Sequence, residues 1–550
     1  MTFIQILADT PIYICDGKAS SIDGEQYLPI LRGSPQVETS ADVIGSDLSA
    51  LVTGEIVLSN GADKLGQGIF DNIDDLYIIG KDVKIFSGDE NASSVSNLIS
   101  VGFGVVENYE ISPSEIRIFV QDKRERFNPS IPEDEFNSTD YADIESQYLG
   151  KRIPILVGPV REIPCIPVNG QTTGTTIKYK ACDFLTSLGS VFTRSGSGDE
   201  WQSNTAINIS LVLGEFEIAS AKNSTTGEIL QCKLVDPEGY AVDYCSDIIK
   251  VLNDKILSIT YNDTEYNTTE WEDEETLLGE GGIYISESEP LNDIFSRVQK
   301  GAKRPFRYDF GYDGRRTIKA DYPERAASVF IQSRGILNLY DAVRLSRVDL
   351  LATEVIEQYK RSYVTNLPLL IKDASGASEA EKYVTSATVS EETILYSEAD
   401  ATTRANERAD LFQQPIREIE LDLSEVGDSS DSSGVFELQG DDGTTLQGDD
   451  GATIEGTFIS FLLDSILSLR VYDYADVELV LGLSNLDQGT IIGREYLGVK
   501  RCKIVSVAPD PGRKINRVRF MIYSDSSISV FIEGDDGRFL QGDDGGFLDG

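Results

Sequence analysis

Acidic motifs are the first candidates for chemistry in this 550-residue chain. The run from Glu270 to Glu275 holds carboxylates at every position except Trp271. Two carboxylates at a defined separation in a cleft are what hydrolysis of a glycan requires. Nothing in the sequence around this run marks one pair of acids over another, so we interpret it as a solvated loop.

The second acidic motif is Gly-Asp-Asp-Gly, which recurs within two arrays of octads. The octads begin at residues 438, 446 and 454, and again at 532, 540 and 548. Short apolar strands joined by such turns predict a meander or a small solenoid coil. The aspartates could hold calcium, but the spacing matches neither the EF-hand loop nor the calcium-binding nonapeptide, so we favour solvated turns. Each array is too short to be stable alone. We therefore hypothesise that the two arrays pair with each other, or with those of neighbouring subunits.

Several common chemistries lack their residues here. The chain has no histidine, which excludes Ser-His-Asp and Cys-His catalysis, histidine-ligated zinc and histidine pH switches. No two of the six cysteines form a CxxC motif, and we expect buried free thiols. The Gly-rich stretch from Ser195 to Gly198 lacks the strand–helix context of a phosphate-binding loop. We predict no catalytic residue, no metal ligand and no cofactor.

The charge balance is strongly acidic. Lys and Arg number 48 and Asp and Glu number 92, giving a net charge of −44. Stable binding to nucleic acid needs clustered basic residues, so we expect none, and such a surface would repel DNA. Acidic surfaces also supply solubility, and composition alone favours this simpler interpretation.

The sequence shows no targeting or membrane segment. The first residues, MTFIQILADTPIYICDGK, lack the basic region of a signal peptide, and no apolar run approaches the length of a membrane span. We expect synthesis in a reducing cytoplasm and no membrane insertion.

Length and pattern predict several domains of mainly β structure with some α, an α+β chain of β-barrel-like or sandwich-like units. We predict a β-barrel-like domain at 1–135, a proline-rich connector at 136–168, a mixed α/β domain at 169–305, a second β/α domain at 306–425, the first octad array at 426–456, a C-terminal β domain at 457–525 and the second octad array at 526–550.

The proline-rich connector has a distinctive composition. Between Tyr148 and Val168 it is apolar but carries prolines at 154, 159, 164 and 167. Because proline lacks an N–H and fixes φ, the stretch is predicted to be neither a helix nor a central strand. We expect an extended segment laid over the edge of a β domain.

Hydrophobic periodicity places the other elements. Strands are predicted at 82–86, 98–106, 115–120, 207–218, 229–234, 306–310, 317–320, 355–363, 477–481, 502–507 and 517–523, with a bulge or close backbone approach near Gly102 and Gly104. Helices are predicted at 241–252, at 290–298 with Pro290 in the first turn, and at 399–412. The last is the clearest exposed helix, with Glu407 between Arg404 and Arg408 and Pro415 at its end.

Several stretches, in this order, resemble the tail-tip or baseplate hub family of bacteriophages, the relatives of the T-even baseplate hub. The resemblance spans roughly residues 40 to 525 and rests on the order of motifs. The motifs are the strand Glu115–Asp122, then Gly150-Lys151-x-Ile153-Pro154 with Val157-Gly158-x-Val160 and Pro164, the helix Asp243–Leu252, the segment from Ile283 through the Pro290 helix, the turn Asp313–Arg315, the strand Glu354–Tyr363, the helix Ala399–Phe412, and Val477–Tyr523 with the Gly489 turn.

The resemblance implies a structural virion protein at the tail tip that assembles as a homotrimeric ring. The resemblance implies that each chain carries two tube-like β-barrels. Three chains would then present six barrels and match a hexameric tail tube. The implied partners are the tail tube or distal tail protein, a central fibre or spike, and the tape-measure protein. DNA would pass through the ring on ejection, and we hypothesise that acidic side chains line its lumen. The octad arrays depart from the family pattern, so the resemblance implies no role for them.

Two other functions remain open. The chain could be a tail-associated cell-wall glycan hydrolase, although no acidic pair is marked among its 92 carboxylates. It could also bind a surface glycan or receptor through the octad arrays.

Overall fold

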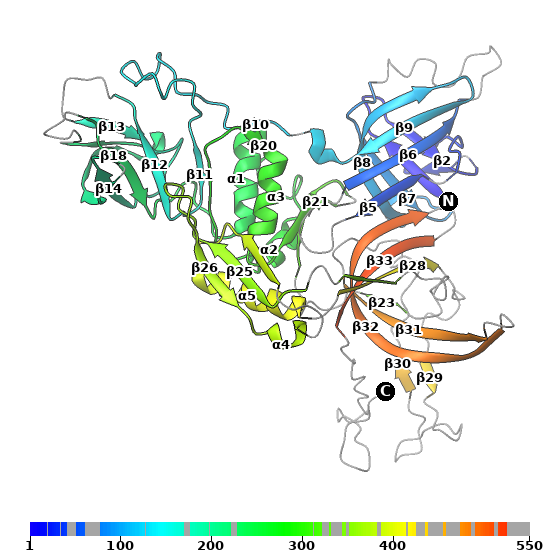
Figure 1. Ribbon diagram of the computed structural model, residues 1–550. Helices are drawn as coiled ribbons and strands as arrows, with labels where there is room; N and C mark the ends of the chain where they lie inside the picture. Colours follow the sequence, from blue (N-terminus) through cyan, green and yellow to red (C-terminus); the bar gives the residue numbers. More distant parts are fainter. Residues whose placement is uncertain are drawn as a thin grey trace.

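The computed structural model describes most of the chain. The described residues are 1–18, 20–33, 35–40, 51–60, 77–126, 128–169, 176–196, 198–219, 221, 228–311, 313–321, 329–331, 344–347, 351–381, 387–413, 416–424, 435–437, 455–457, 474–485, 490–510 and 515–524. They form a mainly β structure with few helices, which confirms the predicted α+β class. Figure 1 shows two arms, one built from the chain's first and last strands and one from its middle.

The N-terminal strands form one end of a thirteen-stranded sheet. The predicted strands at 82–86, 98–106 and 115–120 are confirmed as β7, β8 and β9, and a register shift opposite Ile85 and Phe86 places an irregularity beside Gly102. The elements of this region are β1 (Thr2–Ile6), β2 (Ile12–Cys15), β3 (Ser20–Ile22), β4 (Glu25–Tyr27), β5 (Gln36–Ser40), β6 (Leu51–Ser59), β7 (Asp82–Ser87), η2 (Val95–Asn97), β8 (Ile99–Ile111), β9 (Glu115–Gln121) and η3 (Lys123–Arg126).

The same sheet continues into the last part of the chain. Strand β5 pairs with β32 through Thr39 and Val507, so strands more than 400 residues apart become neighbours. The predicted C-terminal strands are confirmed, and the sheet curls along its length (Figure 1). The strands added here are β23 (Val329–Ile331), β24 (Arg344–Arg347), β28 (Ile416–Ser424), β31 (Tyr474–Asn485), β32 (Thr490–Asp510) and β33 (Ile515–Ser524).

The prediction for the proline-rich connector is wrong in one respect. Strand β12 (Glu162–Pro167) lies in the middle of a seven-stranded sheet although it contains Pro164 and Pro167. Its first four residues pair with β18, and its last two pair with β13. Each half of β12 therefore forms its sheet hydrogen bonds mainly with one neighbouring strand. A proline whose nitrogen faces the unpaired side removes no sheet hydrogen bond.

The rest of the seven-stranded sheet is β13 (Ile177–Lys180), β14 (Ser190–Arg194), β15 (Gln202–Asn204), β16 (Ala206–Ser210), β17 (Glu215–Ile218) and β18 (Gln231–Val235). The strand predicted at 207–218 is two antiparallel strands, β16 and β17, joined by η4 (Leu211–Leu213). Gly214 ends this turn with a φ of 58°, and a Cβ there would approach the Cys182 carbonyl oxygen to 2.2 Å. Periodicity alone did not reveal this reversal.

A helical layer lies between the two arms in Figure 1. Helix α1 (Cys245–Leu257) begins four residues later than predicted, and helix α3 (Leu291–Gly301) has Pro290 as its N-cap. Both pack their apolar faces into the largest core, against the confirmed hairpin of β21 (Phe306–Phe310) and β22 (Arg316–Ala320). Two short strand pairings tie the connector and the segment just before it to this layer: β10 (Ser130–Ile131) pairs with β20 (Glu289–Pro290), and β11 (Ile155–Val157) pairs with β19 (Ile283–Ile285).

The acidic run Glu270–Glu275 is not a solvated loop. It forms helix α2 (Thr268–Glu275), capped by Asn267, whose side chain accepts a hydrogen bond from the Glu270 backbone. Trp271 is fully buried among aromatic rings, and the carboxylate of Glu274 accepts a hydrogen bond from the Ala320 backbone at 2.9 Å. The helix forms because this one tryptophan anchors it, a signal that charge composition conceals. No helix among the described residues is long and apolar enough to cross a bilayer.

The last unit of the middle arm is a three-stranded sheet covered by a helix. It consists of β25 (Glu354–Tyr359), β26 (Leu369–Asp373), β27 (Thr388–Glu392), α4 (Ala377–Ala380) and α5 (Glu398–Phe412). Helix α5 is at the predicted place, but it is not an exposed helix, because Arg404 and Arg408 are buried. Strand β25 is shorter than the predicted 355–363, because Lys360 takes a φ of 47° and interrupts the extended backbone.

Some predictions fall outside the described residues. These are the octads at 438–454 and 526–550, the helix stop at Pro415, the turn at Gly489 and one residue of the β21–β22 turn, Tyr312. Strands β29 (Val435–Glu437) and β30 (Glu455–Thr457) flank the first array and pair with each other. The two ends of that array are thus held together.

All six cysteines are buried and free, which confirms the prediction. Burial raises the pKa of the Cys165 thiol well above its usual range, and those of Cys182 and Cys245 are also raised, chiefly by burial. Since the thiolate is the reactive form, these thiols should be inert in the folded chain.

We therefore expect the native chain to react with less than one equivalent of a thiol reagent at pH 8, and with six equivalents after unfolding in urea. The measurement is the absorbance released by an aromatic disulfide reagent. Fast reaction of two or more thiols in the native chain would contradict the buried placement.

Candidate functional site

A group of four charges, three of them buried, links helix α5 to strands β25 and β27 of the middle arm. The guanidinium of Arg404 donates to Glu357 at 3.0 Å and to Glu391 at 2.7 Å. Arg408 donates to the same two carboxylates at 2.7 and 2.6 Å. The Glu357 side chain is completely buried. Each arginine thus bridges strands β25 and β27, and paired bonds of this kind fix both distance and orientation.

The two bridged strands are parallel, so their carboxyl ends lie at the same edge of the sheet. Loops that follow parallel strands at such an edge commonly form binding sites. Residues 360–363 follow β25, and residues 393–396 follow β27. They meet Pro159–Arg161 of the connector and Gly282 at a small pocket. A Cβ at Gly282 would approach the Pro159 carbonyl oxygen to 2.1 Å, so only glycine permits this contact.

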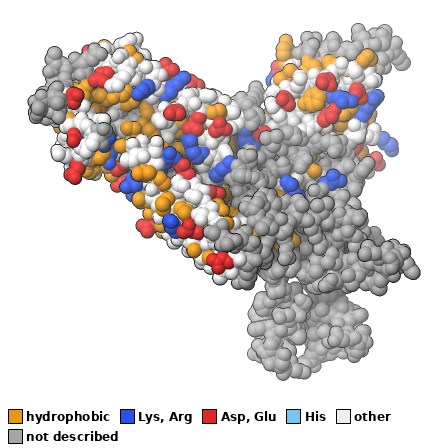
Figure 2. Space-filling view, in the orientation of Figure 1, with side chains coloured by type: hydrophobic (Ala, Val, Ile, Leu, Met, Phe, Trp, Pro, Cys, Tyr) orange, Lys and Arg blue, Asp and Glu red, His pale blue; other side chains and the backbone are white. Residues whose placement is uncertain are grey.

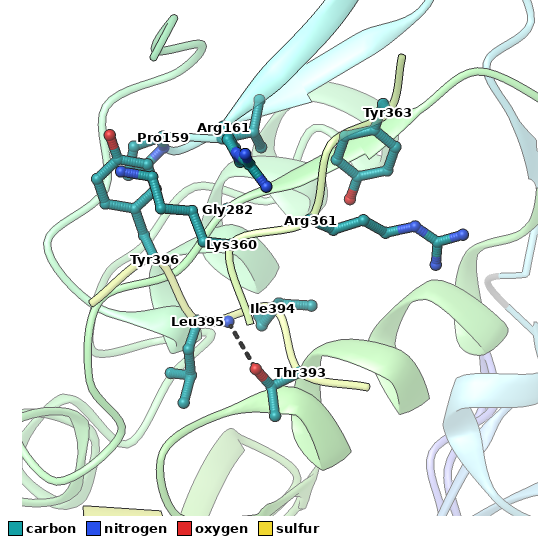
Figure 3. Close-up of a pocket in the computed structure, with 11 residues that line it drawn as sticks. Pro159, Arg161, Gly282, Lys360, Arg361, Tyr363, Thr393, Ile394, Leu395 and Tyr396 are labelled. Atoms are coloured by element: carbon teal, nitrogen blue, oxygen red, sulfur yellow. Dashed lines mark hydrogen bonds between the residues drawn. The ribbon is translucent and has the colours of Figure 1, made fainter. Parts of the chain in front are cut away.

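Three cations line this junction pocket, which we define by Arg161, Lys360 and Arg361. In Figure 3 the Arg161 side chain lies between Tyr396 with Lys360 on one side and Tyr363 with Arg361 on the other. The Nζ of Lys360 lies 3.3 Å from Asp236 and 4.0 Å from the centre of the Tyr396 ring. The Tyr396 hydroxyl donates to the same aspartate at 2.8 Å.

The two arginines of the pocket differ in their partners. Arg361 forms an ion pair with Glu392, but its buried Nε has no hydrogen-bond partner. The Arg161 guanidinium forms no hydrogen bond or ion pair with any residue that the structure describes. Its charge still acts on Glu162: burial raises the pKa of this carboxyl, but donors from Lys233 and Ser362 and the charges of Lys233 and Arg161 outweigh burial and lower it.

Lys360 stays charged in this setting. Burial acts to lower the pKa of its ammonium group, but the Tyr396 hydroxyl and the Asp236 carboxylate outweigh that effect, and the pKa is raised. Its left-handed backbone costs roughly 1–3 kcal/mol, and residues held in this way cluster at functional sites. The strain is offset by a hydrogen bond from its N–H to the Leu395 carbonyl oxygen at 2.8 Å.

The pocket can hold an anionic group but cannot perform acid–base hydrolysis of a glycan. Its lining contains no carboxylate, whereas that reaction needs two. Its cavity volume of about 10 Å³ is enough for about one water-sized group. Among the described residues, no group of three acidic, cysteine or histidine side chains has the arrangement of a metal site.

One buried carboxylate lies apart from the pocket. Burial raises the pKa of Asp183, although the Tyr240 hydroxyl, which donates to it at 2.7 Å, works in the other direction. A raised carboxyl pKa is a property of general acids, but Asp183 does not line the junction pocket. We interpret this residue as a structural acceptor.

The residues of the junction pocket carry no local sequence signal that predicts a site. Arg161 directly follows the motif Val157-Gly158-x-Val160. Nothing in the surrounding residues marks it as a site residue. Lys360 and Arg361 lie within the strand predicted at 355–363, but the structure places them in the segment that follows β25. Only the parallel pairing of β25 and β27 brings them together, and no local pattern encodes that pairing.

Comparisons with known proteins give only remote similarity. No protein-family model and no curated protein sequence matches the chain. Three solved structures resemble it over most of its length. The 43 kDa tail protein of prophage MuSo2 from Shewanella oneidensis is 9% identical with a TM-score of 0.35, covering 95% of this chain and 98% of that one.

The other two are also tail proteins. A tail protein from Neisseria meningitidis MC58 is 8% identical with a TM-score of 0.36, covering 92% of this chain and 97% of that one. The prophage tail protein gp18 from Listeria monocytogenes EGD-e is 8% identical with a TM-score of 0.37, covering 93% and 95%. Scores this low carry no argument about the function of this chain.

The buried charge group yields a stability prediction. Glu357→Gln removes one of the two carboxylates that Arg404 and Arg408 share. Both arginine charges then stay buried with one partner fewer. We expect a loss of about 3–5 kcal/mol in the free energy of unfolding, measured by urea titration. The matched control is Glu407→Gln on helix α5, which removes a more exposed ion pair with Arg304, and we expect a loss of about 1 kcal/mol or less. Equal losses in the two variants would contradict the role given to Glu357.

Asp183 yields a prediction about pH. Because the pKa of its carboxyl is raised in the folded chain, the folded state holds the proton more tightly than the unfolded state. Its contribution to stability is therefore present at about pH 4 and is lost as the pH rises above that value. We expect Asp183→Asn to gain stability relative to the parent between about pH 4 and pH 7. Thermal unfolding across that range measures the change, and Asp199→Asn, which alters an exposed carboxylate, should show none.

Proposed function

We propose that this chain is a structural protein of a bacteriophage tail, the tail-tip or baseplate hub that joins the tail tube to a distal fibre or spike. The observation that carries the proposal is the pairing of β5 with β32, which sets two curled β units side by side in one chain. Two adjacent β units per chain are what the resemblance to the hub family implies.

The arrangement suits a ring. Three copies would supply six β units and match a hexameric tail tube, with the middle arm of each chain left to contact further tail proteins. Symmetric closed rings of identical chains satisfy every interface without open ends. The proposed partners are the tail tube or distal tail protein, the central fibre or spike, and the tape-measure protein.

The charge of the chain fits passage of DNA through such a ring. A net charge of −44 per chain repels phosphate groups, so that DNA would move past without binding. Acidic and basic side chains are interspersed on the coloured part of the face drawn in Figure 2.

The proposal does not rest on the solved structures named above, although their names agree with it. An enzymatic role as a glycan hydrolase gains no support from the junction pocket, which is lined by cations and contains no carboxylate. Receptor binding through the octad arrays is not favoured by any contact among the described residues.

We expect light scattering of the purified full-length chain to give three times its mass of 60.4 kDa. Electron microscopy of the same sample should show rings, and isolated tail tubes should bind the chain. A chain that remains monomeric at all concentrations and also fails to bind tail tubes would overturn the proposal. Zymography on peptidoglycan is the control, and clearing of the gel would favour the hydrolase instead.

A further inference from the structure

The junction pocket and the octad arrays are the two features that the proposed function leaves without a role. The pocket presents the guanidinium of Arg161, which has no hydrogen-bond or ion-pair partner among the described residues, and the buried Nε of Arg361, which also has none. Lys360 adds a third charge whose ion pair with Asp236 is long, at 3.3 Å. The hydrogen-bond donors in this pocket therefore outnumber the acceptors that satisfy them.

We propose that the junction pocket binds an aspartate carboxylate from the first octad array of a second copy of this chain. The inference rests on the proposed assembly of several copies but not on their number or on a ring. It assigns a receptor to an acidic motif that the hub resemblance does not explain.

Chemistry and size favour an aspartate as the occupant. An arginine with free N–H groups is best satisfied by a carboxylate, which accepts two parallel hydrogen bonds. The small cavity admits the end of one short side chain. In the first array the doublets Asp441-Asp442 and Asp449-Asp450 each have glycine on both sides. Flanking glycines add no side-chain bulk, so the backbone can approach the pocket closely.

Charge complementarity favours a partner of the same acidity as this chain. Two chains that each carry −44 repel each other unless acidic groups of one meet basic groups of the other. A pocket that gathers three cations provides such a place, and its partly desolvated position strengthens the attraction compared with the open surface. Opposite charges at an interface also fix its register.

The fold favours a second copy over the same chain as the source. Strands β29 and β30 hold the two ends of the first array together. A closed segment of 17 residues, 438–454, can extend no further than about half its contour, roughly 30 Å, from that pair. Figure 1 places β29 and β30 beside the C-terminal strands, whereas β12 and β25, next to the pocket, lie in the other arm.

Zero-length carbodiimide cross-linking of the full-length chain tests the source of the carboxylate. The reagent joins a lysine amine to a carboxylate that contacts it, and Lys360 supplies the amine. In an equal mixture of ¹⁴N and ¹⁵N chains, we expect Lys360 to be linked to Asp441, Asp442, Asp449 or Asp450 in mixed-isotope peptides. The Lys360–Asp236 link within one chain is the internal control. Links to residues 534–549, or only single-isotope links, would overturn the proposal.

Peptide binding tests the pocket without relying on assembly. The receptor is the full-length chain with the aspartates of all four Gly-Asp-Asp-Gly motifs changed to asparagine, so that its own arrays do not compete. The probe is a fluorescent peptide of residues 438–451, LQGDDGTTLQGDDG, and the control peptide carries asparagine at its four aspartates. We expect fluorescence anisotropy to show binding of the probe only, weakened at least fivefold by Arg161→Gln.

The matched control receptor is Lys372→Gln, which removes the same charge from an exposed position on β26. If Lys372→Gln weakens binding as much as Arg161→Gln, or if the asparagine peptide binds equally well, the pocket is not the receptor. A trimer by light scattering with no Lys360 cross-link to an octad would overturn this inference alone. Pairing of array with array would give that result and would support the hypothesis drawn from the sequence.

Discussion

The buried charge group of helix α5 is the interaction on which the middle arm depends. The Glu357 side chain is fully buried between Arg404 and Arg408, and Glu391 completes the group from the neighbouring parallel strand. Taking three of these charges out of water is costly, and the hydrogen bonds within the group offset that cost. The arrangement therefore tolerates one geometry, which sets the spacing of β25 and β27. The junction pocket lies where those two strands end, so its shape depends on this group.

Charge in this chain has two separate uses. Most acidic residues contribute to the net charge of −44, which repels phosphate groups. A smaller set is buried and satisfied by specific donors, as with Glu274 against the Ala320 backbone and Glu357 against the arginines. Salt screens exposed charges that lie more than about 8 Å apart at physiological ionic strength, and it affects the buried pairs little. The proposed hub needs both, a repelling surface and rigid arms.

The connector shows how one segment can serve several units. It pairs with the helical layer through β11, enters the seven-stranded sheet as β12, and supplies Arg161 to the pocket between them. Gly282 allows the close contact with Pro159 that brings these units together. This segment holds one of the motifs in the hub resemblance and also supplies a residue of the proposed octad receptor.

The sequence by itself determined the class of structure and the position of most elements. Alternation in β7 and β9, the Asp-Gly turn of β21 and β22, and the apolar face of α1 are local signals, because side-chain direction follows directly from helix or strand period. The burial of free thiols and the lack of histidine chemistry also follow from composition. Tertiary structure alone decided the rest. Arg404, Arg408 and Glu274 are of residue types that usually lie on the surface. They are buried here because their partners come from distant strands. The pairing of β5 with β32 and the gathering of Arg161 with Lys360 and Arg361 depend on contacts across hundreds of residues, which no local pattern records.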